Sequence, residues 1–256
     1  MEMNIPKHKA PSLIIPHMEV SVVTPTYNRR RFIPTMIQIY KNQTFPKEKM
    51  EWIVLDDGRD SVADLFANTG IPNLRYIRLE EKMRIGAKRN YLNKEARAPI
   101  IISMDDDDYY PPKRVQIIVD AFAKYPRVDL AGSSELYMYY IDSKTIYHMG
   151  SHGPNRATNG TMAWRKRYSD QHRYDDFVTH AEEESFLDNY RWPMIQLDAK
   201  KTNLMICHQD NTVNKTDLKR EHEEFKGHHK AKMKLTTLKI EDIVQEPELR
   251  DFYRSI

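Results

Sequence analysis

The sequence predicts an α/β fold in which helices flank a mostly parallel central sheet, with a smaller mixed region after it. Short apolar runs alternate with segments of helical spacing through the first half of the chain, which is the pattern of βαβ units. Four of these runs end in polar loops, as strands do when their carboxyl ends meet at a ligand site. At 256 residues the chain is long enough to bury a sizeable core.

The first half of the chain alternates between predicted strands and helices. Apolar and β-branched runs predict strands at 19–24, 52–55, 74–79 and 99–104. Helical spacing predicts helices at 30–42, 61–67 and 84–96 and a fourth from Pro112 onward. Ser61 is the expected cap of the second helix. The inner face of the fourth helix is marked by Val115, Ile118, Val119 and Phe122.

The pattern is less regular in the second half. Further strands are expected at 128–131, 136–141, 161–164, 194–197 and 204–207, with an acidic helix at 180–190 and a loop at 148–160. We expect one domain over 19–212, with halves at 19–125 and 126–212. A leader at 1–18 precedes it, and a charged, helical extension at 213–256 follows.

Composition excludes several classes of protein. Forty Lys and Arg residues nearly balance 37 Asp and Glu residues, which argues against a dedicated nucleic-acid binder. The single cysteine excludes an intramolecular disulfide and fits a reducing compartment. No run approaches the roughly 20 apolar residues of a membrane span, and 12–15 is too short for a signal-peptide core. We therefore expect a soluble, cytoplasmic protein.

The most informative stretch is the acidic cluster Asp105–Asp108, which directly follows an apolar strand. Four adjacent carboxylates repel one another, and a hard divalent cation such as Mg²⁺ or Mn²⁺ neutralises them well. The alternative is a solvated acidic turn. The buried strand before the cluster and Pro112 after it favour a metal site.

The other strand ends carry residues suited to a nucleoside diphosphate. Tyr27 offers a flat face to a base, and Asp56 or Asp57 can accept a hydrogen bond from the base or ribose. Lys88 and Arg89 lie near a helix N-terminus, where charge and free N–H groups both favour phosphate. Each feature has a simpler alternative, since Tyr27 can be ordinary packing and 56–58 only a turn.

Together these motifs resemble the GT-A glycosyltransferases, and most closely the inverting family-two group. The resemblance covers 19–125 well and is partial from there to about 210. It rests on four segments, the third one residue shorter than the commoner form: Pro25-Thr26-Tyr27-Asn28-Arg29, Asp56-Asp57-Gly58, Gly86-Ala87-Lys88-Arg89-Asn90, and Asp105-Asp106-Asp107-Asp108 with Pro112.

The resemblance implies a Rossmann-like GT-A fold and transfer of a sugar from a nucleotide sugar, expected to be a UDP-sugar, to an acceptor hydroxyl. Residues 19–125 would form the nucleotide-binding half and 126–212 the acceptor half. Asp107 would be the principal metal ligand and Asp105 would contact ribose or metal, with Asp106 able to share either role. The implied donor site comprises Pro25, Thr26, Tyr27, Arg29, Asp56, Asp57, Lys88, Arg89, Asn90, Asp105 and Asp106.

The resemblance also implies a catalytic base at the head of a later helix. The candidates are Glu182, Glu183 and Glu184, where the family usually has Asp. Spacing to Leu187 favours Glu184, with Glu183 next. Such a base removes the proton of the sugar hydroxyl as it attacks the anomeric carbon, so no covalent nucleophile is needed. Some of these acids are expected only to complement the helix dipole.

Three further positions are implied with alternatives. His208 would complete the metal shell or contact the diphosphate, or be structural. Gly160 and Thr161 would line the cleft for the donor sugar and acceptor. Trp164 would be a sugar-stacking platform or part of the core.

Other function classes stay open at this point. A metal-dependent sugar nucleotidylyltransferase would usually show a glycine-rich first loop, which 25–29 is not. A non-catalytic nucleotide-sugar-binding module is the other alternative. The acceptor, a glycan or another hydroxyl-bearing molecule, has no motif. The C-terminal residues Leu235, Leu238, Ile240 and Ile243 have loosely helical spacing and would pack on the core, form a homodimer or touch an anionic membrane surface.

Overall fold

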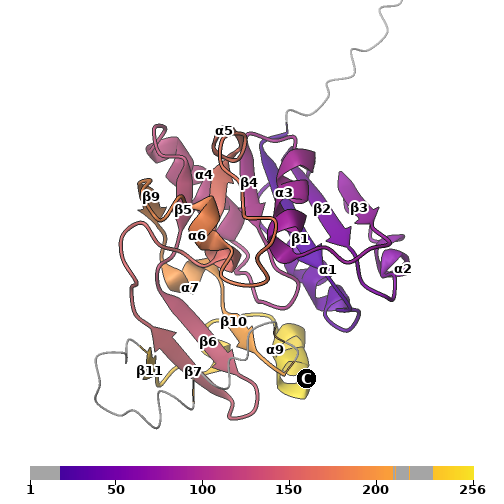
Figure 1. Cartoon of the computed structure of the whole chain (residues 1–256). Helices are drawn as coiled ribbons and strands as arrows, with labels where there is room; N and C mark the ends of the chain where they lie inside the picture. The colour runs from indigo at the N-terminus through magenta and orange to yellow at the C-terminus, as the bar shows by residue number, and fades with distance from the viewer. Residues whose placement is uncertain (1–17, 210, 212–218, 220–232) are drawn as a thin grey trace, which may run out of the picture.

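The computed structural model describes residues 18–209, 211, 219 and 233–256. The expected leader, apart from Met18, and most of the basic C-terminal segment 226–234 lie outside the described residues. Within them the chain forms a seven-stranded sheet in the order β3-β2-β1-β4-β8-β5-β9 and a four-stranded sheet in the order β10-β6-β7-β11. Figure 1 shows the larger sheet with its helices above and the smaller sheet below, beside the C-terminal helix.

The first half forms the parallel part of the large sheet, as predicted. Its strands are β1 (Val20–Thr26), β2 (Met50–Asp56), β3 (Leu74–Arg78) and β4 (Ile100–Ser103). All neighbouring pairs among them run parallel. Every residue of β1, β2 and β4 is buried, because helices cover both faces of such a sheet. The carboxyl ends of these strands therefore share one edge.

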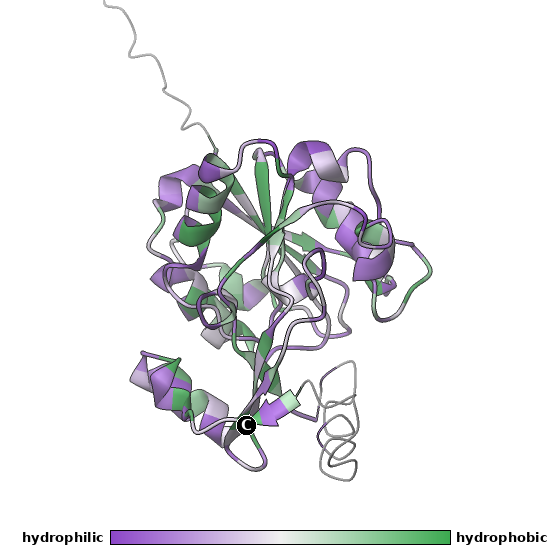
Figure 2. Ribbon diagram, turned by 90° about the vertical axis from the view of Figure 1, so that its left-hand side faces the viewer, coloured by the Kyte–Doolittle hydropathy of each residue, from purple (hydrophilic) through white to green (hydrophobic). Residues whose placement is uncertain are grey.

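The helices between these strands lie where helical spacing predicts them. They are α1 (Ile33–Asn42), α2 (Ala63–Phe66), α3 (Ile85–Glu95) and α4 (Arg114–Lys124), with a 3₁₀ turn, η1 (Lys47–Lys49), before β2. The predicted cap of α2 is wrong: Val62 occupies the cap position, and the Ser61 hydroxyl accepts from the Ala63 N–H at 3.3 Å. Figure 2 shows hydrophilic helices outside and apolar strands within.

The second half continues the large sheet with one reversed strand. β8 (Ala163–Arg165) runs antiparallel to β4 and to β5 (Leu130–Gly132), and β9 (Met194–Gln196) is parallel to β5. The 3₁₀ turn η2 (Asn159–Thr161) leads into β8. Two short helices, α5 (Lys166–Ser169) and α7 (Ala199–Thr202), follow β8 and β9. The sheet is thus mostly parallel, as expected.

The smaller sheet contains two strands that the sequence pattern missed, at 145–149 and 233–235. β6 (Leu136–Tyr140) pairs antiparallel with β7 (Thr145–Met149) and parallel with β10 (Met205–Cys207). β11 (Met233–Leu235) pairs antiparallel with the other edge of β7. The expected loop at 148–160 therefore begins inside β7. A left-handed residue, Lys144, with φ 54°, closes this hairpin. A Lys carries no strong turn signal, so the hairpin was not anticipated.

The predicted helix at 180–190 is much shorter than expected. Only α6 (Glu183–Phe186) is helical. Ala181 before it and residues 188–190 after it have positive φ angles, between 48° and 63°. A right-handed helix cannot pass through left-handed residues, so the backbone limits α6 to a single turn.

The C-terminal residues that are described pack on the core. After β11 come a 3₁₀ turn, η3 (Ile240–Asp242), and helix α9 (Pro247–Ser255). The expected helical spacing from Leu235 to Ile243 is wrong, since Leu235 ends β11 and of the other three only Ile240 lies in η3. Ile240, Leu249 and Tyr253 are buried in the same cluster as the sheet residues. In the described part of the chain, no helix has the length and apolar character needed to cross a bilayer.

Candidate functional site

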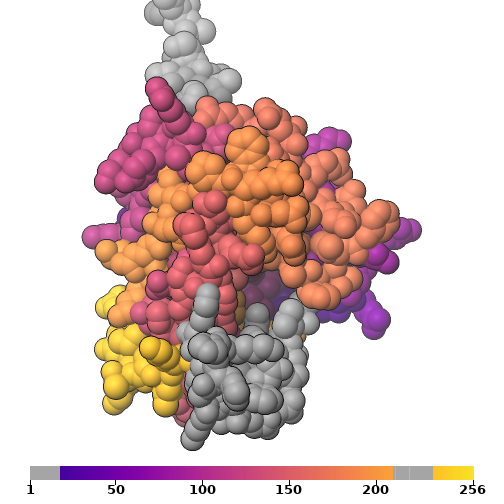
Figure 3. All heavy atoms as spheres, turned by 60° about the vertical axis from the view of Figure 1, so that its left-hand side comes forward, coloured from indigo at the N-terminus to yellow at the C-terminus, as the bar shows by residue number. Residues whose placement is uncertain are grey.

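A cleft of about 870 Å³ opens at the carboxyl ends of β1 and β4, and we call it the acidic cleft. Figure 3 shows the molecule turned by 60°, with atoms of the second half, in orange, filling much of the face that comes forward. The walls of the cleft come from both halves: Pro25, Thr26, Tyr27, Asn28, Arg29, Lys82, Ile85, Lys88, Arg89, Asp105, Asp106, Asp107, Asp108, Thr158, Asn159, Gly160, Thr179, His180, Ala181, Glu182, Glu183, Met205 and Asn211.

The four aspartates of the cluster have different surroundings. Asp108 accepts from the Ile206 N–H at 3.0 Å and from the Asn203 amide at 3.2 Å, which ties it to the strand β10 region. Asp105 forms an ion pair with Arg89 at 3.0 Å. Asp108 therefore anchors the cluster, and Asp105–Asp107 are left as the candidates for ligand binding.

Asp106 and Asp107 lie beside the guanidinium group of Arg29, at 3.7 and 3.6 Å. Burial and the charge of Asp107 raise the pKa of Asp106 to about 8. Burial also opposes ionisation of Asp107, but the hydrogen bond to His208 and the charge of Arg29 lower its pKa. Asp106 Oδ2 is fully buried with no hydrogen-bond partner among the described residues. The pKa values of these two carboxyl groups are therefore shifted in opposite directions.

Asp107, His208 and Asn211 form a compact polar group. His208 Nε2 lies 3.2 Å from Asp107 Oδ2, and the Asn211 amide lies 3.3 Å from the same oxygen. No three acidic, histidine or cysteine side chains among the described residues are grouped so as to hold a metal by themselves. Mg²⁺ is usually held by one or two carboxylates together with substrate phosphates. These side chains, with the unpaired Asp106 oxygen, fit a cation that takes its remaining ligands from the phosphates of a substrate.

The basic wall of the cleft is the N-terminal part of α3. The ammonium group of Lys88 forms an ion pair with Asp57 and donates to the Thr26 carbonyl at 3.1 Å, and burial lowers its pKa. Arg89 bridges Glu182, at 2.8 Å, and Asp105. Arg89 thus joins the acidic cluster to the start of α6, from the other half of the chain.

Tyr27 lies in the cleft wall. The ammonium group of Lys82 lies 4.1 Å from the centre of its ring, which is within cation–π distance. Pro25 and Thr26 line the same wall. Lys82 carries no signal in the sequence, because it stands in a charged loop between β3 and α3 and meets Tyr27 only in the fold.

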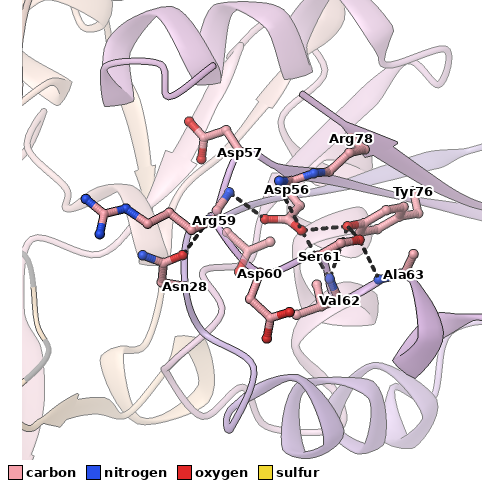
Figure 4. Close-up of polar contacts among 12 residues, drawn as sticks. Asn28, Asp56, Asp57, Arg59, Asp60, Ser61, Val62, Ala63, Tyr76 and Arg78 are labelled. Carbon is pink, nitrogen blue, oxygen red and sulfur yellow. Dashed lines mark hydrogen bonds and ion pairs between the residues drawn. The ribbon is translucent and has the colours of Figure 1, made fainter. Parts of the chain in front are cut away.

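Three predicted donor-binding residues do not line the acidic cleft. The Asp56 carboxylate accepts from the Tyr76 hydroxyl at 2.5 Å and the Gly58 N–H at 2.8 Å, as Figure 4 shows. In the same view the side chain of Asp57 points away from this group, and it accepts from the Met83 N–H at 2.7 Å. Asn90 bonds Tyr174 and Asp176 on another face of α3. Asp56 and Asp57 shape the loops, and Asp57 positions Lys88.

The three candidate bases, Glu182, Glu183 and Glu184, have different surroundings. Glu182 pairs with Arg89, and Glu184 is exposed and outside the cleft wall. Glu183 lines the cleft and accepts from the Asn159 N–H at 2.7 Å. Burial, and then the charge of Glu182, raise its pKa to about 7. The geometry therefore favours Glu183 over the Glu184 that spacing favours.

Of the three residues expected at the sugar side, only Gly160 reaches the cleft. A Cβ at Gly160 would lie 3.2 Å from Asp108 Oδ2, so the turn fits closely against the cluster. Thr161 is buried, and its hydroxyl accepts from the Ser133 N–H. Trp164 is 1% exposed and donates to Asn93 at 3.1 Å within the core. The sugar-stacking alternative for Trp164 is wrong, because its ring is covered by protein.

Two asparagines at the site were not singled out from the sequence. Asn159 donates to Glu183, and Asn211 contacts both Asp107 and His208. Each stands within three residues of a position that the resemblance marks, Gly160 and His208. That proximity is the only signal that would have found them, since asparagine is common in loops.

The chain was compared with known proteins. Residues 21–220 match the family model described as Glycosyl transferase family 2. A curated relative, poly(ribitol-phosphate) β-N-acetylglucosaminyltransferase TarS of Staphylococcus aureus, is 31% identical over 97 residues, 36% of this chain and 17% of TarS. The chondroitin synthase of Escherichia coli is 26% identical over 74% of this chain and 21% of its own length. The chain thus spans about a fifth or less of these relatives.

Solved structures agree in fold. Residues 1–349 of S. aureus TarS in complex with UDP-GlcNAc superpose with a TM-score of 0.61 at 19% identity, covering 76% of this chain and 60% of that one. A mannosyltransferase from Pyrobaculum calidifontis in complex with GDP-Man and Mn²⁺ gives 0.61 at 14% identity, covering 80% and 61%. The fold is GT-A, as the sequence resemblance implies, and the family match spans well over half of the chain. The chain therefore belongs to glycosyl transferase family 2.

Proposed function

We propose that this chain transfers a sugar from a nucleotide-sugar donor to an acceptor hydroxyl with inversion at the anomeric carbon. The observation that carries the proposal is that Glu183 and the acidic cluster face one cleft from opposite halves of the chain. A base and a site for a phosphate-bound cation are the two parts that this chemistry needs. Family membership favours this reading over a sugar nucleotidylyltransferase.

A UDP-sugar is the donor that we propose first. Support comes from the TarS complexes with UDP and UDP-GlcNAc, although the P. calidifontis structure holds GDP-Man. The wall formed by Pro25, Thr26 and Tyr27 would take the base, and Lys88 and Arg89 would face the diphosphate. They lie near the start of α3, where the positive end of the helix dipole also favours an anion.

Asp107 is proposed as the principal metal ligand, with Asp105 and His208 as its companions. A bound Mn²⁺ or Mg²⁺ would supply charge neutralisation for the departing diphosphate. The guanidinium group of Arg29 lies beside both carboxyl groups and balances the charge of Asp107. The chain's own cations, Lys88 and Arg89, add to the stabilisation of the leaving group.

Glu183 is proposed as the general base. Its pKa of about 7 places proton uptake near neutral pH, where a base is both ionised in part and strong enough to act. The N–H of Asn159 donates to the carboxylate and so favours its ionised form. The hydroxyl of the acceptor, a glycan or another hydroxyl-bearing molecule, gives its proton to Glu183 and attacks the anomeric carbon from the face opposite the diphosphate.

The deciding experiment assays a panel of nucleotide sugars for donor hydrolysis and transfer, with and without Mn²⁺. Glu183→Gln keeps the size of the side chain and is expected to lower turnover by about 10²-fold or more while UDP still binds. Glu184→Gln, one residue away and exposed, is the matched control and should stay near wild type. Full turnover by the Glu183→Gln protein would contradict the proposed role of Glu183. A wild-type chain that binds the donor but never turns it over would be a binding module.

A further inference from the structure

Tyr174 is a buried residue next to the acidic cleft that has no part in the proposed reaction. It is 2% exposed and lies outside the set of residues that line the cleft. Its backbone N–H donates to Asn90 Oδ1 at 2.9 Å, and its carbonyl accepts from Asn90 Nδ2 at 2.8 Å. Its ring stacks on Phe186, with the ring centres 4.2 Å apart. Tyr174 is therefore fixed in place by α3 on one side and by α6 on the other.

The hydroxyl of Tyr174 is the one hydrogen-bond partner of the Asn159 side chain within the described ranges. Asn159 Nδ2 donates to this hydroxyl at 2.8 Å, whereas Asn159 Oδ1 is fully buried and has no partner there. Asn159 is 2% exposed, so its amide has little access to water. Without the hydroxyl, both polar atoms of a buried amide would be unpaired, which is unfavourable. The Tyr174 hydroxyl therefore determines where the Asn159 side chain lies.

The backbone of Asn159 connects this contact to the proposed base. The Asn159 N–H donates to Glu183 Oε1 at 2.7 Å, and Asn159 is the first residue of the turn η2. The direction of this N–H depends on how the turn is held. Tyr174 and Glu183 thus anchor one residue from two sides, the first through its side chain and the second through its backbone.

The other charged and titratable groups around Glu183 come from three places in the fold. They are Glu182 beside it, Arg89 of α3, and the phenols of Tyr174 and Tyr190. Burial raises the pKa of both phenols, so both are neutral at neutral pH. Burial and then the charge of Glu182 raise the pKa of Glu183, whereas the Asn159 N–H and the charge of Arg89 lower it. The Asn159 N–H is therefore one of the groups that stabilise the ionised base.

We propose that Tyr174 is a positioning residue for the general base, and that its hydroxyl acts through Asn159 to keep the backbone N–H aimed at the Glu183 carboxylate. A hydrogen bond to the ionised form of a carboxyl group favours that form. A donor that is already in place costs no rearrangement when the base acts. This inference rests on the proposed function for the role of Glu183 and adds to it a residue that does not touch the substrate.

Tyr174→Phe removes the hydroxyl and keeps the ring that stacks on Phe186. The pKa of Glu183 should rise by about one pH unit, because its ionised form loses a well-aligned donor. The ¹³C signal of the Glu183 side-chain carboxyl, assigned with Glu183→Gln, measures this pKa in the full chain. The measurement needs no turnover, so it is independent of the transferase activity.

Steady-state rates give a second readout. In Tyr174→Phe the turnover number should fall about fivefold near pH 7 and return toward the wild-type value by about pH 9, because the base is again ionised there. The KM for the donor should not change, since Tyr174 lies outside the cleft wall. A merely structural loss would lower turnover by the same factor at every pH.

Tyr168→Phe is the matched control. Tyr168 is also 2% exposed and packs on Phe186, but its hydroxyl donates to the Phe186 carbonyl at 2.9 Å rather than to Asn159. Its loss removes a buried hydrogen bond from the same group of aromatic rings. Tyr168→Phe should therefore lower the melting temperature and leave the pKa of Glu183 at its wild-type value.

Asn159→Ala removes the other partner of the hydroxyl and decides the matter if Tyr174→Phe does not fold. It should raise the pKa of Glu183 as Tyr174→Phe does, and the double variant should add no further shift, because both changes break one contact. An unmoved pKa in the folded variants, or shifts that add in the double variant, would overturn the positioning role. Absence of turnover in the wild-type chain would contradict the proposed function instead, and the ¹³C measurement would still test the contact.

Discussion

Adjacent acidic residues of this chain differ in their surroundings, and only some of them face the acidic cleft. Glu183 and Glu184 are neighbours of the same type, yet one accepts from the Asn159 N–H in the cleft and the other faces solvent. Asp107 and Asp108 differ in the same way, since the first meets His208 and the second holds Ile206. A run of identical residues cannot show this difference, because it depends on where each side chain points.

The pKa of Glu183 leads to a prediction about pH. Burial raises it from the ordinary value to about 7, so the carboxylate takes up a proton as pH falls through that value. Transfer activity should therefore fall to half near pH 7 on its acid side, since only the ionised form accepts a proton. Steady-state rates from pH 5.5 to 8.5, about 1.5 units on either side, test this. UDP binding, which does not need the base, is the control and should lack this limb.

The acidic cluster gives a prediction with an internal control. Asp107→Asn should weaken Mn²⁺ binding in the presence of UDP by more than about tenfold, because it removes a ligand charge. Asp108→Asn should mainly lower the melting temperature, because Asp108 accepts from Ile206 and Asn203 inside the fold. Calorimetric titration and thermal unfolding separate the two effects. Equal losses of metal affinity in both variants would contradict the assignment.

At the scale of elements, α3 is the part that joins the two halves of the chain. Its N-terminal part carries Lys88 and Arg89 into the acidic cleft, and its start packs against the segment 173–178. Gly86 belongs to a segment that the sequence resemblance marks. The structure adds the reason for the missing side chain: a Cβ there would lie 1.9 Å from the Asp175 carbonyl oxygen. The contact is with the protein backbone.

Gly86→Ala should therefore destabilise the protein by about 1–3 kcal/mol or more, as overpacking does. The 173–178 segment must move away from α3. This movement should also loosen the residues that connect it to Glu182 and Glu183. Urea unfolding measures the loss of stability, and hydrogen exchange should show weaker protection in both segments. A variant as stable as wild type would mean that the two elements do not pack as closely as described.

At the scale of the whole molecule, the C-terminal helix packs on the core of the large sheet. Leu249 and Tyr253 of α9 are buried with strand residues, and the Tyr253 hydroxyl donates to the Asp108 carbonyl at 3.3 Å. Glu246, just before α9, accepts from the Tyr109 hydroxyl at 3.0 Å. We propose that 233–256 unfolds together with the large sheet. A homodimer through this region stays a prediction.

Leu249→Ala tests this coupling. Removing a buried Leu side chain should cost about 2–5 kcal/mol and lower the midpoint of one cooperative transition. Glu248→Ala, an exposed neighbour in the same helix, should change stability by less than about 0.5 kcal/mol. Separate transitions for α9 and for the sheet, seen by local fluorescence probes, would show that the extension folds independently.

The sequence by itself determined the order of strands and helices through residue 125 and several of the loops that line the acidic cleft. Apolar runs and turn residues act over a few neighbours, so they can be read locally, as with β1 and β4. The resemblance added the family and its GT-A fold. Local patterns failed where no turn signal exists, as at Lys144, and where left-handed backbone at Ala181 and beyond stops a helix.

Only the tertiary structure decided which residues meet. Arg89 and Glu182 are 93 positions apart, and Asp107 and His208 are 101 apart, yet each pair is in contact. Trp164 became core rather than a sugar platform because Tyr174 and Phe186 close over it. Such outcomes depend on side-chain direction and on the packing of distant segments, which no local pattern of residues records.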